Sequence, residues 1–452
     1  MLTKLFKWVG GAKRPGALKG KPTVITRSEH SISRANISKH ALKVLYQLKD
    51  AGYQAYLVGG GVRDVLLDKH PKDFDLATDA LPEEVQKLFR NCRLIGRRFR
   101  LAHVHFGTHI VEVATFRASS QTPDKAEFNP HLVHSDAGMI LRDNVYGTLE
   151  EDVLRRDFTV NALYYNIADF SVIDFMGGMQ DLKDRILRMI GDAHQRFRED
   201  PVRMLRAIRF AAKLDFKIHP DTEKAIYELA DVIKQVPSAR LLDDYLKLFL
   251  SGYAEKSFEL LRHYGLFKAL FPETEASLAG KEGAQVLAFI TGALQDTDRR
   301  VSENKPVALP FLLAAFLWNP VQQQTRALIA EGVSEVNAFF DACDLVLQRQ
   351  QKNVAISRRY MQVIREVWIL QMRLARRQGK RAIQVYVHPR FRAGYDFLCL
   401  RAKTGETGLE ELVDWWTKYV ESDDEDRAVI VEALNKSREE RGSYRRRRKK
   451  RV

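Results

Sequence analysis

The sequence predicts an α/β head domain with a mixed sheet and helices, followed by a long all-α region. Residues 102–106 and 109–116 alternate in polarity and are rich in strand-forming residues, which is typical of β-strands. Before them, residues 55–67 contain a short apolar run, three glycines and the start of a helix. From about residue 178 the pattern becomes helical and remains so. The chain therefore divides into a mixed head and a helical remainder.

Chain length and charge narrow the classes of protein. A chain of 452 residues exceeds one simple core, so two to four domains are expected. The formal net charge of +15 favours a polyanionic partner, either nucleic acid or an anionic membrane surface. The three cysteines are far apart and form neither a disulfide framework nor a CxxC metal motif. This usage is typical of a reducing compartment and predicts a cytoplasmic protein.

The N-terminal region and the apolar runs bear on membrane attachment. Residues 1–35 are basic and lack the apolar core of a signal peptide, so we expect a flexible extension. The longest apolar run, residues 307–318, is too short to span a bilayer and reads as a buried helix. We therefore expect no integral membrane segment. Peripheral contact of residues 1–22 with a membrane surface is left open.

Two carboxylates follow the glycine turn. Residues i and i+2 of a strand point to one face, so Asp73 and Asp75 project together. Such a pair repels unless a cation lies between the carboxylates, and Mg²⁺ is the usual partner where phosphates bind. The backbone N–H groups of a turn at 59–61 suit phosphate oxygens. The plain alternative, a solvated Asp pair at a strand end, is weakened by the occurrence of both features in one short unit.

Two charged stretches lie further along the chain. Residues 150–163 on their own read as a helix with i,i+4 ion pairs. Asp200 and Pro201 are typical of a helix start, and Asp200 is explained by that role alone. Arg203 and Arg206, however, lie on one face near Asp200, and an Asp with an Arg can satisfy the Watson–Crick edge of a base.

Taken together, these motifs resemble those of the class II nucleotidyltransferases, which include the bacterial poly(A) polymerases and CCA-adding enzymes. The segment 94–104 is more similar to the poly(A) polymerases. The resemblance implies a nucleotidyltransferase head and a helical remainder. We divide the chain into a basic extension at 1–35, the catalytic head at 36–177, a helical neck or RNA-binding domain at 178–275, a helical body with an arginine-rich region at 276–430, and a disordered basic tail at 431–452.

The resemblance also implies roles for individual residues. Asp73, Asp75 and Asp157 would be catalytic, with Asp73 and Asp75 holding Mg²⁺. Glu112, on the strand 109–116, competes with Asp157 as the third carboxylate at the metals, although a Glu at a sheet edge often only forms an ion pair. Binding of ATP, the substrate, is implied for the remaining matched positions, which are Gly59, Gly60, Arg63, Arg156, Asn161, Asp200, Arg203 and Arg206.

The implied reaction is template-independent addition of AMP from ATP to single-stranded RNA 3′ ends, with release of pyrophosphate. This tailing would promote RNA decay, and RNA-decay proteins would be the protein partners. Basic residues interleaved with aromatics at 358–395 suit single-stranded RNA, unless those aromatics form a helical core. One alternative is a CCA-adding tRNA nucleotidyltransferase, which would incorporate CTP. The other is a non-catalytic RNA-binding scaffold, which would show no metal-dependent ATP turnover.

Overall fold

The computed structural model describes residues 21–71, 73–96, 100–118, 132–134, 140–143 and 145–435. The chain divides into two compact units, with the boundary between Leu229 and Ala230. This boundary lies inside the segment 178–275 that the sequence analysis assigned to the neck. The basic segment at 97–99, the N-terminal residues 1–20 and the tail at 436–452 lie outside the described residues, so the expectations made for them are not addressed by the structure.

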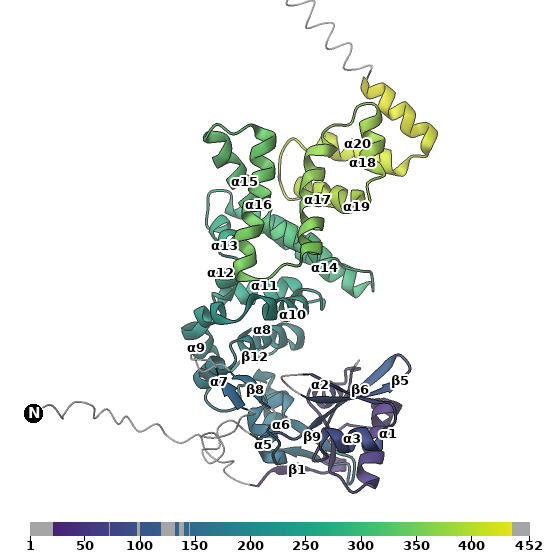
Figure 1. The fold of residues 1–452 in the computed structure, drawn as a ribbon, viewed down its shortest axis with the longest axis vertical. Helices are drawn as coiled ribbons and strands as arrows, with labels where there is room; N and C mark the ends of the chain where they lie inside the picture. The colour runs from purple at the N-terminus through teal and green to yellow at the C-terminus, as the bar shows by residue number, and fades with distance from the viewer. Residues whose placement is uncertain are drawn as a thin grey trace, which may run out of the picture. The chain divides into compact units, whose positions relative to one another are not determined.

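The first unit is built around an eight-stranded mixed sheet with the strand order β1-β10-β9-β2-β3-β6-β5-β4 (Figure 1). β3 and β6 run parallel, and the other neighbouring pairs run antiparallel. The predicted mixed α/β head is therefore confirmed. The strands are β1 Thr23–Ile25, β2 Ala55–Val58, β3 Asp75–Thr78, β4 Cys92–Ile95, β5 Leu101–Phe106, β6 His109–Thr115, β9 Leu163–Asn166 and β10 Val172–Asp174.

Helices pack on this sheet, and further helices of the first unit follow it in the chain. The first helix begins at the predicted cap, because the Ser38 hydroxyl accepts a hydrogen bond from the Ala41 N–H at 3.2 Å. It contacts the third helix, and both pack on the sheet, so they share one face. The helices are α1 Lys39–Asp50, α2 Gly60–Leu66, α3 Pro82–Leu88, α5 Leu149–Arg155, α6 Gly178–Asp184, α7 Ala193–Glu199, α8 Val202–Leu214 and α9 Pro220–Leu229.

Short strand pairs complete the first unit. β7 Leu132–His134 and β8 Ile140–Asp143 pair antiparallel, within a stretch that reads from its composition as a long loop. β11 Ile186–Leu187 and β12 Lys217–Ile218 pair in parallel. They connect the chain segment before α7 and α8 to the segment that follows α8. The helical region is therefore not purely α, since this two-stranded pair lies beyond residue 178.

The second unit is helical throughout its named elements (Figure 1). Its centre is α15, which packs against α13, α14, α16 and α17. Phe316 of α15 lies in a buried aromatic cluster, with ring centroids 5.3 Å from Phe271 and 5.5 Å from Phe249. The helices are α10 Ser238–Phe249, α11 Ala254–His263, α12 Leu266–Leu270, α13 Pro272–Leu278, α14 Gly283–Ser302, α15 Leu309–Ala330, α16 Glu335–Asn353, α17 Arg358–Leu374, α18 Lys380–Tyr386, α19 Phe391–Lys403 and α20 Glu410–Glu421.

The aromatic residues of the basic 358–395 segment lie largely in the core. Trp368 is fully buried and donates its indole N–H to the Ala314 carbonyl at 3.1 Å. Phe391 and Tyr395 are buried in a cluster around Trp416. The alternative expectation, a helical core with a basic outer face, therefore describes these aromatics. Within the described part of the chain, no helix has the length and apolar character needed to cross a membrane.

Candidate active site

Gly59 lies at the turn between β2 and α2, where the backbone passes close to two charged side chains. Its φ of +68° falls in the region that favours glycine. A Cβ atom at this position would lie 3.6 Å from Nη1 of Arg156 and 3.8 Å from Oδ2 of Asp75. Gly61 is also close-packed, since a Cβ there would lie 3.3 Å from the Phe74 ring. The glycine turn thus brings bare backbone to an acidic and a basic side chain.

Asp75 is the first residue of β3 and is the centre of a small acidic group. It pairs in register with Glu112 of the parallel strand β6 and with Val58 of β2. Asp73 precedes it by two residues and is exposed. Asp75 is exposed at the surface, yet desolvation by the protein around its carboxylate raises its pKa, and the negative charges of Glu112 and Asp73 raise it further. Adjacent strands therefore bring Glu112 beside Asp75, as one of the two alternatives for the third carboxylate requires.

This acidic group has the chemistry of a divalent-cation site. Carboxylate oxygens are the ligands that Mg²⁺ prefers, and the repulsion felt by Asp75 is relieved when a cation binds. Among the described residues, however, no three His, Cys, Asp or Glu side chains converge closely enough to form a ready-made metal cluster. The donors thus fit Mg²⁺ in kind. Substrate phosphates and water would have to complete its coordination.

Asp157 has a different environment. Its Oδ1 accepts hydrogen bonds from the Phe158 N–H at 2.8 Å and from the Asn161 amide at 3.1 Å. Its Oδ2 forms an ion pair with Arg206 at 2.6 Å. Burial alone would raise the pKa of Asp157, but the Arg206 charge and these hydrogen bonds lower it to about 2. Asp157 is therefore ionised at neutral pH and positions Arg206 of α8 against the head.

Arg156 is held by two residues that sequence reasoning did not single out. Its Nη2 lies 3.0 Å from the Asp152 carboxylate, and its Nε donates to the Tyr164 hydroxyl at 2.6 Å. The Tyr164 hydroxyl in turn donates to Asp152 at 2.7 Å. Burial would raise the pKa of Asp152, but Arg156 and Arg155 lower it, so the group stays charged. The i,i+4 spacing of Asp152 and Arg156 was the sequence signal that could have identified this ion pair. The Nη1 atom of Arg156 remains directed toward Gly59.

Arg63, predicted to cradle the triphosphate, is buried in the first unit. Its Nε and Nη2 donate to the Asp64 carboxylate at 2.8 and 2.6 Å, and its Nη1 donates to the Asn161 carbonyl oxygen at 2.5 Å. Its guanidinium also lies 5.0 Å from the centre of the Phe210 ring. Arg63 therefore connects α2 to Asn161 and to α8, and these contacts fix the helix that follows the glycine turn.

The second predicted motif surrounds the start of α8. Asp200 is the residue after α7, and α8 begins at Val202, one residue later than predicted, with Pro201 at the N-cap. Asp200 is partly exposed. Arg203 turns back from α8, donating to the Arg196 carbonyl at 2.9 Å and lying 3.3 Å from the Glu199 carboxylate.

Arg196 and Glu199 form the buried support of this motif, and sequence reasoning missed both. Arg196 pairs with Glu199 at 2.9 Å and donates to the carbonyls of Arg155 and Arg156 at 2.6 and 2.7 Å. Burial and the nearby Arg203 lower the pKa of Arg196 to about 10, so it remains cationic at neutral pH. The i,i+3 spacing of Arg196 and Glu199 was the available signal. Their contacts bind the second motif to the loop that carries Asp157.

The chain is similar to known proteins along most of its length. The Poly A polymerase head domain family matches residues 55–188, the family described as probable RNA and SrmB-binding site of polymerase A matches 215–278, and polymerase A arginine-rich C-terminus matches 331–452. Poly(A) polymerase I of Escherichia coli O157:H7 is 46% identical over 430 residues, covering 95% of this chain and 92% of that protein. This chain belongs to the poly(A) polymerase family.

The chain is also similar to CCA-adding enzymes, but at lower sequence identity. The CCA-adding enzyme of Lactobacillus helveticus is 36% identical over 225 residues, covering 49% of this chain and 52% of that protein. The crystal structure of the Bacillus stearothermophilus CCA-adding enzyme in complex with CTP has a TM-score of 0.54 and 25% identity, covering 83% of this chain and 80% of that one. The resemblance predicted from the motifs and the prediction of a nucleotidyltransferase enzyme are both confirmed.

Proposed function

We propose that this chain transfers AMP from ATP to the 3′ ends of RNA without a template and releases pyrophosphate. The observation that carries the proposal is the meeting of Asp75, Glu112, Gly59 and Arg156 beside the interior strands β3 and β6 of the sheet. It places carboxylates for metal binding beside a cationic group and an unhindered backbone turn, which phosphoryl transfer requires. The similarity to poly(A) polymerase I over nearly the whole chain supports the same reaction.

We assign metal binding to Asp73 and Asp75, with Glu112 as the third carboxylate. Glu112 is favoured over Asp157 because it faces Asp75 in register, whereas the oxygens of Asp157 are occupied by Arg206, Asn161 and the Phe158 N–H. Two Mg²⁺ ions bound there would stabilise charge on the attacking 3′ oxygen and on the leaving pyrophosphate.

The basic residues would bind and orient ATP. Arg156 is held rigidly by Asp152 and Tyr164, with Nη1 directed toward the Gly59 turn, where it would meet a phosphate oxygen. Gly60 would allow the backbone of the same turn to approach the phosphates. Arg63 and Asn161 would act behind this surface by fixing α2, in keeping with the burial of Arg63. Each of these assignments predicts a weaker ATP affinity on substitution.

Asp200 and Arg203 would select the base, and Arg206 would complete the binding surface beside them. Support comes from the partial exposure of Asp200 and from the hold of Glu199 on Arg203. A carboxylate acceptor and a guanidinium donor together can read the edge of adenine. Fixing Arg203 before ATP arrives would lower the entropic cost of that recognition.

The decisive experiment incubates labelled generic RNA, and separately tRNA lacking its CCA end, with each NTP and Mg²⁺. Extension of generic RNA with ATP alone is the expected result. Efficient CTP incorporation confined to the tRNA would instead establish a CCA-adding enzyme, and no NTP turnover would establish a non-catalytic RNA-binding scaffold. The first alternative is less favoured because the CCA-adding relative aligns with only 49% of this chain.

The cellular setting belongs to the same proposal. All three cysteines are free, which suits a reducing cytoplasm. RNA would be bound as a single strand, and its tailing would promote decay together with RNA-decay proteins. Recovery of tailed decay intermediates from cells that carry this chain, and their loss on its deletion, would test this setting.

A further inference from the structure

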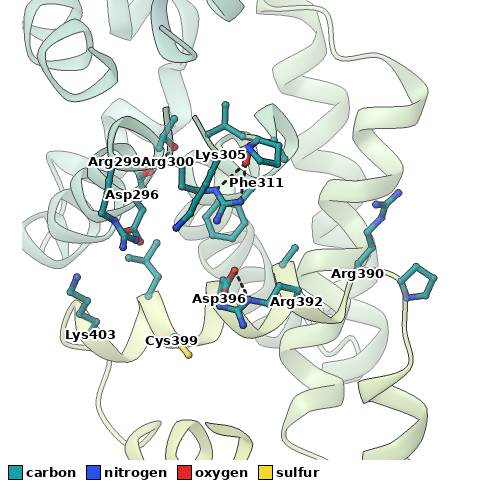
Figure 2. Close-up of a pocket in the computed structure, with 18 residues that line it drawn as sticks. Asp296, Arg299, Arg300, Lys305, Phe311, Arg390, Arg392, Asp396, Cys399 and Lys403 are labelled. Carbon is teal, nitrogen blue, oxygen red and sulfur yellow. Dashed lines mark hydrogen bonds and ion pairs between the residues drawn. The ribbon is translucent and has the colours of Figure 1, made fainter. Parts of the chain in front are cut away.

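A cavity of about 680 Å³ lies within the second unit and is lined by none of the residues assigned to ATP (Figure 2). It is formed by the C-terminal half of α14, the loop that follows, the first turn of α15, and α19 with the residues before it. Its volume falls within the range of small-molecule sites, roughly 300–1,000 Å³. All of its lining residues belong to the part of the chain that the structure describes.

The lining is strongly cationic. Six basic side chains face two carboxylates, and they come from both sides of the cavity. Most of the basic groups are compensated by ion pairs, either within the lining or just outside it. The four compensated pairs are Arg299 with Asp296, Arg392 with Asp396, Arg390 with Glu366, and Lys305 with Glu303. Arg300 and Lys403 form no ion pair with any carboxylate that the structure describes.

Arg300 is fixed in place while keeping its charge. Its Nε and Nη2 donate to the Pro306 carbonyl oxygen at 3.0 and 2.9 Å, as Figure 2 shows. A neutral carbonyl orients the guanidinium but leaves its positive charge available. Its influence reaches α19, because burial raises the pKa of Asp396 while the charges of Arg392 and Arg300 oppose that rise. Arg300 is therefore a preoriented cation on the α14 side.

Lys403 supplies the second available charge, from α19. It is exposed, and its ammonium group makes no ion pair with any residue in the described part of the chain. Figure 2 places Lys403 and Arg300 on different walls of the cavity. Two cations on different elements that line the same cavity suit a phosphate group, which offers several oxygen acceptors at once.

The remaining wall is apolar and includes an aromatic ring. Leu400 and Ala293 are buried, and Phe311 is partly exposed in the first turn of α15. The Phe311 ring is held edge-on to Phe397, with centroids 5.7 Å apart and planes at 76°. An aromatic ring beside cations is the combination that binds a nucleotide, since bases stack on the ring and phosphates pair with the cations.

We propose that this cavity binds one nucleotide unit, with its phosphate at Arg300 and Lys403 and its base against Phe311. The unit could belong to an RNA strand or to a free nucleotide, because both offer the same base and phosphate. Binding of a unit that belongs to RNA rests on the proposed function, whereas binding of a free nucleotide does not. Either would be a second nucleotide site, formed by the second unit alone and distinct from the ATP residues of the first.

The test uses the full chain and the double variant Arg300→Gln/Lys403→Gln. The control, Lys281→Gln/Lys352→Gln, removes the same charge from two exposed lysines of the second unit outside the cavity. Anisotropy of a fluorescein-labelled oligoadenylate, measured without Mg²⁺ at several salt concentrations, gives affinity and salt slope. Equilibrium dialysis of the RNA-free protein with labelled Mg-ATP gives the number of ATP molecules bound per chain.

Relative to the control, the cavity variant should bind RNA several-fold more weakly, with a salt slope shallower by about 0.7 for each phosphate that it no longer neutralises. Phe311→Leu should weaken RNA binding with an unchanged slope. Loss of one bound ATP per chain would support the cavity with a free nucleotide as its source. Equality with the control in affinity, slope and ATP stoichiometry would overturn the proposal. These binding measurements need no turnover, so they stand even if the wild-type chain adds no AMP.

Discussion

Arg206 and Asp157 form an ion pair of 2.6 Å although 49 residues separate them in the chain. This pair joins α8 to the loop that follows Arg156 and so connects the two sequence motifs assigned to ATP. Because only 10% of the Asp157 side chain is exposed, its charge depends on that contact. The link between the motifs is therefore electrostatic and sensitive to single substitutions.

Asp157 should contribute to stability in a pH-dependent way. Its pKa is lowered to about 2 from an ordinary value of 3.8, so its contribution is complete above about pH 4 and is lost as the pH falls toward 2. The shift corresponds to about 2 kcal/mol. Denaturant unfolding of wild type and Asp157→Asn should show a difference at pH 6 that shrinks between pH 4 and pH 2. A constant difference over that range would contradict the assigned pKa.

Removal of either carboxylate that we assign to metal binding, Asp73 or Asp75, should abolish AMP incorporation. Asp73→Asn and Asp75→Asn keep the shape of the side chain but lose its charge, and metal stabilisation worth several kcal/mol corresponds to roughly a thousandfold in rate. RNA affinity, measured by anisotropy, should stay near that of wild type. Asp68→Asn is the control, since Asp68 is an exposed acid outside the group. Near-normal tailing by Asp73→Asn or Asp75→Asn would refute its assignment.

Tyr164→Phe should weaken ATP binding by loosening Arg156. The lost hydroxyl donates to Asp152 and accepts from Arg156, so its removal leaves the buried Asp152 and the partly buried Arg156 short of a partner, at a cost of about 1–3 kcal/mol. The KM for ATP should rise more than kcat falls. Tyr165→Phe, a change to the neighbouring buried tyrosine, is the control. Equal effects of the two substitutions would argue against a specific role for Tyr164.

Glu199→Gln should destabilise the first unit and change nucleotide choice. Glu199 is the counter-ion of both Arg196 and Arg203, and breaking a buried pair costs about 3–5 kcal/mol. Freed from Glu199, Arg203 should discriminate less between ATP and CTP. The kcat/KM ratio for the two nucleotides measures this effect, beside the exposed control Glu228→Gln. An unaltered ratio in a folded variant would exclude a selective role for Arg203.

Gly59→Ala should impair activity more than an ordinary glycine substitution. Its φ of +68° and ψ of −136° strain any other residue by about 1–3 kcal/mol, and the turn is also flanked by Arg156 and Asp75. Gly107→Ala is the matched control, because φ is +61° there but no atom lies within 4 Å of the added Cβ. AMP incorporation and the melting temperature of both variants separate backbone strain from disturbance of the site.

The sequence by itself was sufficient for features that arise from local physics. The Ser38 cap, the strands around residues 102–116 and the buried helix at 307–318 follow from capping and hydrophobic periodicity, which involve only near neighbours. The motifs also placed Gly59 and Asp75 in one short unit of the chain, because only the helix Gly60–Leu66 and the loop after it separate them. Their spacing and order identified the family as well.

The tertiary structure decided which of these residues meet. Strand order puts Glu112 beside Asp75, and the packing of α8 brings Arg206 into an ion pair with Asp157. No local sequence pattern encodes either contact. The tertiary structure also sent Trp368 and Phe391 into the core, because burying large aromatic surface outweighs their availability to RNA. Register and long-range ion pairs depend on contacts between residues distant in the chain, so only the folded molecule could fix them.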